Sequence, residues 1–124
     1  MTHTLTISGT LPGLNEIIAA NRKKSYVGAK LKRDTDKIIL WAIREHLHDV
    51  KIASPVHMAY TWYEPNRRRD KDNISAGGRK SIQDALVKSG SLQGDGWAHI
   101  EGFSDTFAVD KTNPRIVVII EEVG

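Results

Sequence analysis

Apolar and polar residues change their spacing several times along the chain, and each spacing predicts a different element. Leu5 and Ile7 alternate with polar residues over Thr2–Ser8, which predicts a half-buried strand that ends before a Pro-Gly turn. Apolar residues then recur at helical spacing over about 34–50, where an Asp-Thr pair would cap the helix. A second helical pattern fills Asp72–Ser89 and stops at a glycine. The first two thirds of the chain therefore mix strand and helix patterns.

Three further segments have the composition of strands. They are Val56–Tyr63, Ala98–Phe107 and Arg115–Glu122. Ile116–Ile120 is continuously apolar, so the last strand should be central in its sheet. Asn15–Lys32 is ambiguous, because a short helical pattern at its start is followed by a basic stretch that we expect to be a mobile loop.

Together these elements predict one α+β domain over residues 1–124. The expected order is β-α-β-α-β-β, as a two-layer α/β sandwich in which a small mixed sheet of about four strands is covered by two main helices. A chain of 124 residues and 13.8 kDa is large enough for one hydrophobic core and too small for two. A pair of adjacent glycines, Gly77-Gly78, weakens the second helix, which indicates either a close approach by another segment or a break.

The overall composition excludes several classes of protein. The sequence has no apolar run long enough to cross a membrane, and its first residues do not resemble a signal peptide, so a soluble cytoplasmic protein is expected. The absence of cysteine excludes disulfides, thiolate zinc sites and a cysteine nucleophile. Five histidines lack the spacing of metal ligands. Any catalysis must therefore use oxygen and nitrogen groups.

Positive charge is concentrated in two windows. Thirteen of the eighteen lysines and arginines lie in Arg22–Lys37 and Arg67–Lys80. Clustered cations of this kind favour a polyanion partner, usually nucleic acid, although a solvated surface has the same composition.

The second window also contains two carboxylates. Asp70 and Asp72 are separated by one residue and directly follow a predicted strand, next to Arg67, Arg68 and Arg69. Mg²⁺ prefers one or two carboxylates together with water and phosphate oxygens, so the segment predicts a metal site within a phosphate-binding surface. If the chain is extended here, both side chains share one face. The structural alternative is that Asp72 only caps the following helix.

Other residues are candidates for the same site. Asp95, in a turn flanked by glycines, would add a third carboxylate, although such aspartates are often structural. Lys80 would offset charge at the scissile phosphate, with Asp84 orienting it or joining the metal shell; alternatively the two form an exposed ion pair one helical turn apart. The tryptophans at positions 41, 62 and 97 are most simply explained by packing, although Trp97 follows the turn of Asp95.

At this point the sequence resembles the RusA-like Holliday junction resolvases, small phage and prophage endonucleases. The resemblance depends on Arg67–Asn73, Lys80, Asp84–Gly90 and Asp95, with Pro12 and Asn15 as weaker matches near the start. It covers roughly residues 60 to 105. Two features depart from the enterobacterial form: the stretch between Asn73 and Lys80 is longer, and Gly96 replaces a second acid after Asp95.

The resemblance implies a homodimeric, Mg²⁺-dependent enzyme, in which Mn²⁺ can substitute, that nicks two opposed strands of a four-way DNA junction in recombination and repair. The implied metal ligands and catalytic carboxylates are Asp70, Asp72 and Asp95, with Lys80 assisting. The residues expected to bind DNA are Arg67, Arg68, Arg69, Lys71, Asn73, Arg79, Arg22, Lys23, Lys24, Lys30, Lys32 and Arg33. A host bacterial cytoplasm and a phage or prophage origin follow from the same resemblance.

Three alternatives stay open on the sequence. A noncatalytic junction or duplex DNA-binding module explains the basic windows but not the carboxylates inside them. A transferase with an Asp-x-Asp motif shares the acidic pair, but it normally needs a larger nucleotide-binding domain. A phage structural protein with the same fold, without activity, would keep the same residues.

Overall fold

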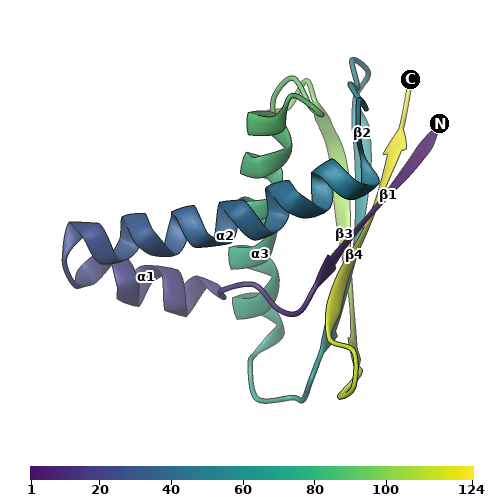
Figure 1. Cartoon of the computed structure of the whole chain (residues 1–124). Coiled ribbons are helices and arrows are strands. Elements are labelled where there is room, and N and C mark those ends of the chain that lie inside the picture. The colour runs from purple at the N-terminus through teal and green to yellow at the C-terminus, as the bar shows by residue number, and fades with distance from the viewer.

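The computed structural model describes all 124 residues and contains four strands and three helices. In chain order they are β1 (Thr2–Ser8), α1 (Leu14–Arg22), α2 (Ser25–His46), β2 (Val56–Glu64), α3 (Lys71–Ser89), β3 (Ile100–Val109) and β4 (Arg115–Glu122). The strands form one mixed sheet in the order β1-β4-β2-β3. All three helices lie on one side of this sheet, and α1 and α2 extend away from it beyond α3 (Figure 1). The predicted α+β fold with a four-stranded mixed sheet is confirmed.

Strand pairing places β4 inside the sheet, as its apolar sequence predicts. β4 pairs antiparallel with both β1 and β2, whereas β2 and β3 are parallel. The parallel pair is connected by α3, so β2, α3 and β3 form a crossover unit. The carboxyl ends of β2 and β3 therefore lie together at one edge of the sheet, beside the first turn of α3.

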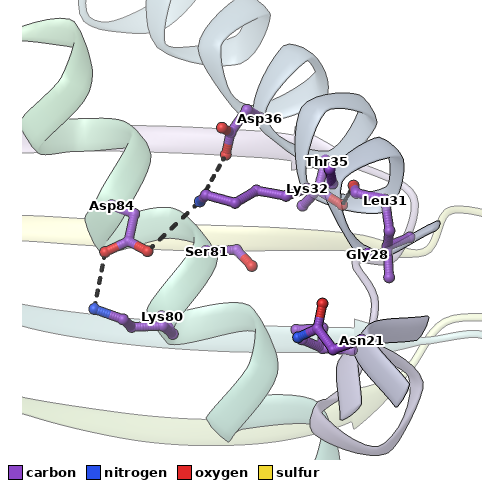
Figure 2. A pocket seen from close by; sticks show the side chains of 11 residues that line it. Asn21, Gly28, Leu31, Lys32, Thr35, Asp36, Lys80, Ser81 and Asp84 are labelled. Atoms are coloured by element: carbon purple, nitrogen blue, oxygen red, sulfur yellow. Dashed lines mark hydrogen bonds and ion pairs between the residues drawn. The ribbon is translucent and has the colours of Figure 1, made fainter. Parts of the chain in front are cut away.

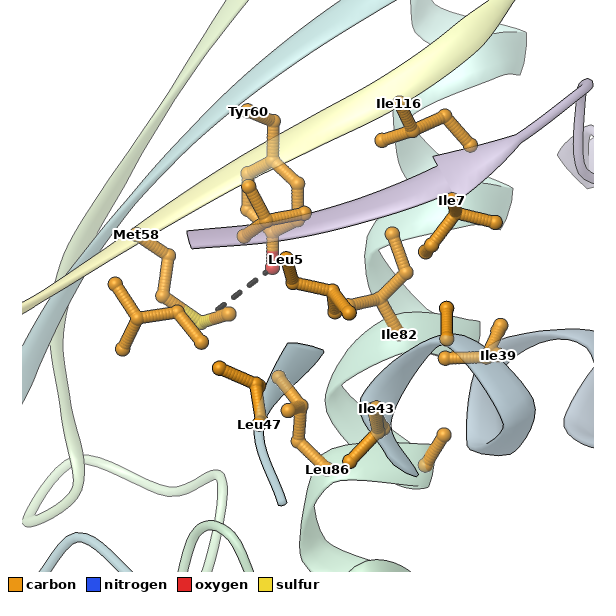
Figure 3. Packing of buried hydrophobic residues seen from close by; sticks show 14 of the residues in the cluster. Leu5, Ile7, Ile39, Ile43, Leu47, Met58, Tyr60, Ile82, Leu86 and Ile116 are labelled. Carbon is orange, nitrogen blue, oxygen red and sulfur yellow. Dashed lines mark hydrogen bonds between the residues drawn. The ribbon is translucent and has the colours of Figure 1, made fainter. Parts of the chain in front are cut away.

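The core fills the space between the sheet and the helices. Along β2, alternate residues from Val56 to Glu64 are buried, which is the two-residue period of a strand with one covered face. Tyr60 and Trp62 stack with ring centroids 5.4 Å apart. Tyr60 lies in one cluster with Leu5 and Ile7 of β1 and with apolar residues of α2 and α3 (Figure 3). Trp62 belongs to the same cluster.

The two glycines of α3 mark close approaches, and the helix is not broken there. A Cβ on Gly77 would lie 2.6 Å from backbone atoms of Gly13 and Leu14, and one on Gly78 would lie 2.4 Å from the Trp62 ring. Larger residues would push α3 away from the start of α1 and from the sheet. Gly90 ends the helix with φ of 86°, as its position predicts.

The prediction of a mobile basic loop is wrong, because α2 begins at Ser25 rather than near residue 34. Thr35 does not cap a helix; it is buried, and its hydroxyl donates to the carbonyl of Leu31 within α2. Gly28 lies against Asn21 of α1, so α1 covers the first turns of α2 and stabilises them. The domain consequently has three helices instead of two.

Two of the three tryptophans are not packed as expected. Trp62 is buried, but Trp41 is 63% exposed and Trp97 is 101% exposed. In α2 the exposed Trp41 lies on the side opposite the buried Ile39 and Ile43, so the apolar stripe is narrower than the sequence suggests. None of the helices has the length and apolar character needed to span a membrane.

Candidate functional site

Asp70 and Asp72 lie where β2 and β3 end and α3 begins. Asp70 is the residue before the first helical turn, in extended conformation with φ of −68° and ψ of 148°, and its side chain makes no capping hydrogen bond. Asp72 is already inside the first turn, so the expectation that both side chains lie on one face of an extended chain is wrong. Both carboxylates are exposed and form no ion pair.

An open cavity of about 660 Å³ adjoins Asp70. It is lined by the last residues of β2 and β3, by Arg67, Arg69 and Lys71, and by Phe107. Crevices at the carboxyl ends of parallel strands are common ligand sites, and the free amides of a helix N-terminus attract anions. The cavity therefore combines a position for a cation at Asp70 with positions for phosphate oxygens, while Asp72 lies outside its lining.

Glu64 also lines this cavity and holds Arg69. No prediction from the sequence named this residue. The guanidinium donates from Nε and Nη2 to the two Glu64 oxygens at 3.0 and 2.9 Å, and from Nη1 to the Leu11 carbonyl at 2.8 Å. The hydrogen bond with Glu64 raises the pKa of Arg69 above its usual value. The two-residue period of β2 would have identified Glu64, since it places this carboxylate on the buried face.

Lys80 belongs to a second charged cluster, midway along α3. Its Nζ lies 3.0 Å from Asp84 and 3.8 Å from Asp95. The hydrogen bond and the charge of Asp84, followed by the charge of Asp95, raise the pKa of Lys80. The predicted ion pair of Lys80 with Asp84 is thus present, and the Asp95 turn is tied to α3 by the same lysine.

The network continues from α3 to α2 (Figure 2). Lys32 lies 3.8 Å from Asp84 and 3.7 Å from Asp36, which is nearly buried. These residues form one wall of a cavity of about 330 Å³ between α1, α2 and α3. Lysines and aspartates alternate along this network, so each charge is offset by a neighbour.

The two clusters are separate within the chain. Eight helical residues from Asp72 to Lys80 correspond to about 12 Å along the axis of α3. Asp95 lies with Lys80, and no three carboxylates or histidines are close enough to hold one metal ion. The structure therefore does not bring Asp70, Asp72 and Asp95 together as the resemblance implies. The physical reason is that the turn of Asp95 is tied to Lys80, about two helical turns beyond Asp72 along α3.

The predicted DNA-binding residues near Asp70 divide into exposed and internally bonded ones. Arg67, Arg68 and Lys71 are exposed. The internally bonded ones are Arg69, described above; Arg79, which pairs with Asp105 and lies over the Phe103 ring; and Asn73, which accepts a hydrogen bond from the Asn15 amide. The last three stabilise the fold and are poorly placed to contact DNA.

The remaining predicted DNA-binding residues lie on the α1–α2 hairpin. Arg22, Lys23 and Lys24 form its turn, and Lys30, Lys32 and Arg33 follow on α2. Lys30 pairs with Asp34 at 2.7 Å, while Arg22, Lys23, Lys24 and Arg33 are exposed and form no ion pair. The hairpin extends beyond α3 (Figure 1), so its tip presents a compact group of free cations.

Comparisons with known proteins do not assign a family or a function to the chain. No protein-family model matches the chain, and no curated protein matches its sequence.

Proposed function

We propose that this protein is a Mg²⁺-dependent endodeoxyribonuclease that acts as a homodimer on four-way DNA junctions. The observation that carries the proposal is the exposed, unpaired carboxylate couple Asp70 and Asp72 beside Arg67, Arg68 and Lys71. A carboxylate couple without a cationic partner, set among cations at an open cavity, has the chemistry of a site for metal and phosphate. Phage origin and action in the bacterial cytoplasm belong to the same proposal.

The residues present supply the kind of ligand that a divalent metal prefers, namely two exposed carboxylates, one on either side of Lys71, without a cationic partner. Asp70 and Asp72 would hold the ion, and its chemistry would be to activate water and to stabilise the leaving oxygen of a phosphodiester. Arg67 and Lys71 would hold phosphates of the cut strand, and the first-turn amides of α3 would donate hydrogen bonds to a further phosphate oxygen. Lys80 and Asp95, about 12 Å from Asp72 along α3, would contact another part of the same DNA.

Two copies are needed for paired nicks. A four-way junction has twofold symmetry, so a C2 dimer presents one Asp70 site to each of two opposed strands. The cationic tip of the α1–α2 hairpin would bind the phosphates of a junction arm. Its free Arg22, Lys23 and Lys24 should each contribute about 0.9 to the slope of log affinity against log salt.

A synthetic mobile four-way junction and a linear duplex of the same sequence, each with Mg²⁺ or with EDTA, provide the test. Symmetric paired nicks on the junction alone, only with metal, are expected. Asp72→Asn should abolish cleavage and leave junction binding intact, because it removes one charge from the metal couple. Asp49→Asn, at an exposed turn outside both clusters, is the matched control and should cleave normally. Cleavage by Asp72→Asn at the normal rate would refute the assignment.

The separation of Asp95 from Asp70 and Asp72 favours one second candidate, a noncatalytic junction or duplex DNA-binding module. In that case the cations bind phosphates and the exposed aspartates serve only the start of α3. The same assay separates the two functions: tight junction binding without any cut in Mg²⁺ or Mn²⁺ is the outcome for a binding module.

A further inference from the structure

Trp97 is the most exposed large apolar side chain of the folded domain. Its exposure of 101% means that no other part of the chain covers its ring. Single exposed apolar residues are common at protein surfaces, so exposure alone identifies no site. Tryptophan, however, buries a large apolar area when a flat partner covers its ring. Three features of the surroundings of Trp97 indicate which partner that is.

The first feature is a turn held in place by the rest of the fold. The amides of His99 and Ile100 both donate to the Gly96 carbonyl at 3.0 Å, which closes the backbone around Trp97. The preceding Asp95 is tied to α3 through Lys80 at 3.8 Å. A ring on a preorganised turn loses little conformational entropy when a partner binds.

The second feature is the absence of an apolar surround. No other large apolar side chain between residues 90 and 102 is exposed. The next one along the chain is Phe103, which is 50% exposed and has the Arg79 guanidinium over its ring. A protein partner would need a broader apolar patch with several anchors. A nucleobase needs only one aromatic face.

The third feature is the cationic neighbourhood. Lys80 carries the Asp95 turn and is 70% exposed, and Lys32 and Lys88 on the same ion-pair network are 62% and 64% exposed. Each of these lysines also faces an aspartate, but exposed ion pairs contribute little to stability, so a phosphate can replace the aspartate at small cost. Lysines beside an exposed ring are the combination found where single-stranded nucleic acid binds, with the cations on the backbone and the ring on a base.

From these features we infer that Trp97 is a stacking platform for an unpaired nucleobase of DNA bound across the Lys80–Asp95 cluster. The inference rests on the proposed function, because it takes DNA as the substrate, and it adds that the bound DNA has a base free of its pair near this turn. Loss of the ring should lower affinity for single-stranded DNA and for the junction by about fivefold to 150-fold, the range for one base stacked on an aromatic residue.

Tryptophan fluorescence of the full chain tests this directly. In a Trp41→Phe background, Trp97 is the only exposed tryptophan, since Trp62 is buried. Titration with a single-stranded oligonucleotide or a mobile junction should quench its emission, and titration with a linear duplex should quench it much less. In the otherwise native chain, Trp97→Ala should weaken single-strand and junction binding, measured by fluorescence anisotropy, and leave duplex affinity unchanged. Trp97→Phe should retain most of the affinity, and Trp41→Ala is the matched control.

Loss of stability does not confuse these outcomes, because Trp97 makes no contact whose removal would unfold the chain; equal thermal midpoints for wild type and Trp97→Ala verify this. Junction cleavage with unquenched Trp97 emission and normal Trp97→Ala affinity would overturn the inference and leave the proposed function standing. Absence of DNA binding by the wild type at low salt would overturn both. Emission that changes with protein concentration alone would assign Trp97 to a contact between copies and also overturn the inference.

Discussion

Replacing Arg69 with methionine tests whether the Glu64–Arg69 pair holds the candidate site in place. Glu64 is 8% exposed and Arg69 is 22% exposed, and two hydrogen bonds of 2.9 and 3.0 Å join them. Methionine keeps much of the apolar stem but removes all charge and every donor. The Glu64 carboxylate then remains at the base of the cavity without its partner, and the carbonyl of Leu11 loses a hydrogen bond.

The expected cost follows from this geometry. Removing one partner of a buried ion pair costs about 3–5 kcal/mol, and the partial exposure of Arg69 places this pair at the low end, about 3 kcal/mol. For a domain of this size, that corresponds to a fall of about 9–15 °C in the thermal midpoint. Because whole domains are stable by only about 5–15 kcal/mol, the variant should fold but unfold at markedly lower urea concentration.

A double-variant cycle isolates the pair itself. Glu64→Gln together with Arg69→Met leaves no unpaired buried charge, since the other partner of Arg69, Glu16, is 55% exposed. The double variant should therefore be more stable than Arg69→Met alone. Arg68→Met, at an exposed neighbouring position, should change the free energy of unfolding by less than about 0.5 kcal/mol. Urea unfolding followed by circular dichroism measures all four proteins. A loss under about 1 kcal/mol in Arg69→Met, or a double variant no more stable than the single one, would refute the role assigned to the pair.

Two further variants test the packing and the acid stability. Gly77→Ala should lower the free energy of unfolding, measured in urea, by about 1–3 kcal/mol, because the new Cβ would lie 2.6 Å from the Gly13 backbone; this outweighs the gain of about 1 kcal/mol from the helical preference of alanine. Gly96→Ala is the control and should be neutral, because a Cβ there meets nothing. A neutral Gly77→Ala would contradict the close approach. The hydrogen bond from His3 lowers the pKa of Glu122, so this carboxylate stabilises the fold above the usual carboxyl range and the contribution is lost as pH falls through the lowered value. As the pH is lowered below about 5, the free energy of unfolding should therefore decrease less steeply in Glu122→Gln than in wild type. Equal slopes of unfolding free energy against pH would exclude a contribution from Glu122.

The elements that periodicity specifies strongly were predictable from the sequence. The strand β2 alternates buried and exposed residues throughout, and the continuously apolar β4 lies between two neighbours. The start of α2 was not predictable in the same way, because its first four residues, Ser25–Gly28, all favour helix less than alanine does. Their helix is stabilised by packing against α1, which is a contact between segments rather than a property of either one.

The site was predictable in composition but not in geometry. The sequence shows that Asp70 and Asp72 stand among cations; both are exposed in the structure, and Asp70 lines a cavity. It does not show that Arg69 is bonded to Glu64, since that depends on how the loop after β2 brings the arginine back to the end of the strand. Nor does it show which partner Lys80 selects, because Asp84 is one helical turn away and Asp95 returns to the helix through the following loop.

The arrangement of charges along α3 also limits how one protomer can act. Asp70 and Asp72 stand free at the N-terminal end, where the helix dipole stabilises their negative charge and attracts phosphate. Lys80, about 12 Å further along, is already neutralised by Asp84 and Asp95. A single phosphodiester group cannot contact both clusters directly. If DNA is the substrate, the carboxylates Asp70 and Asp72 would therefore contact the cleaved phosphodiester at one end of α3. The cluster of Lys80 and Asp95, together with the Trp97 ring, would contact a different part of the DNA at the other end.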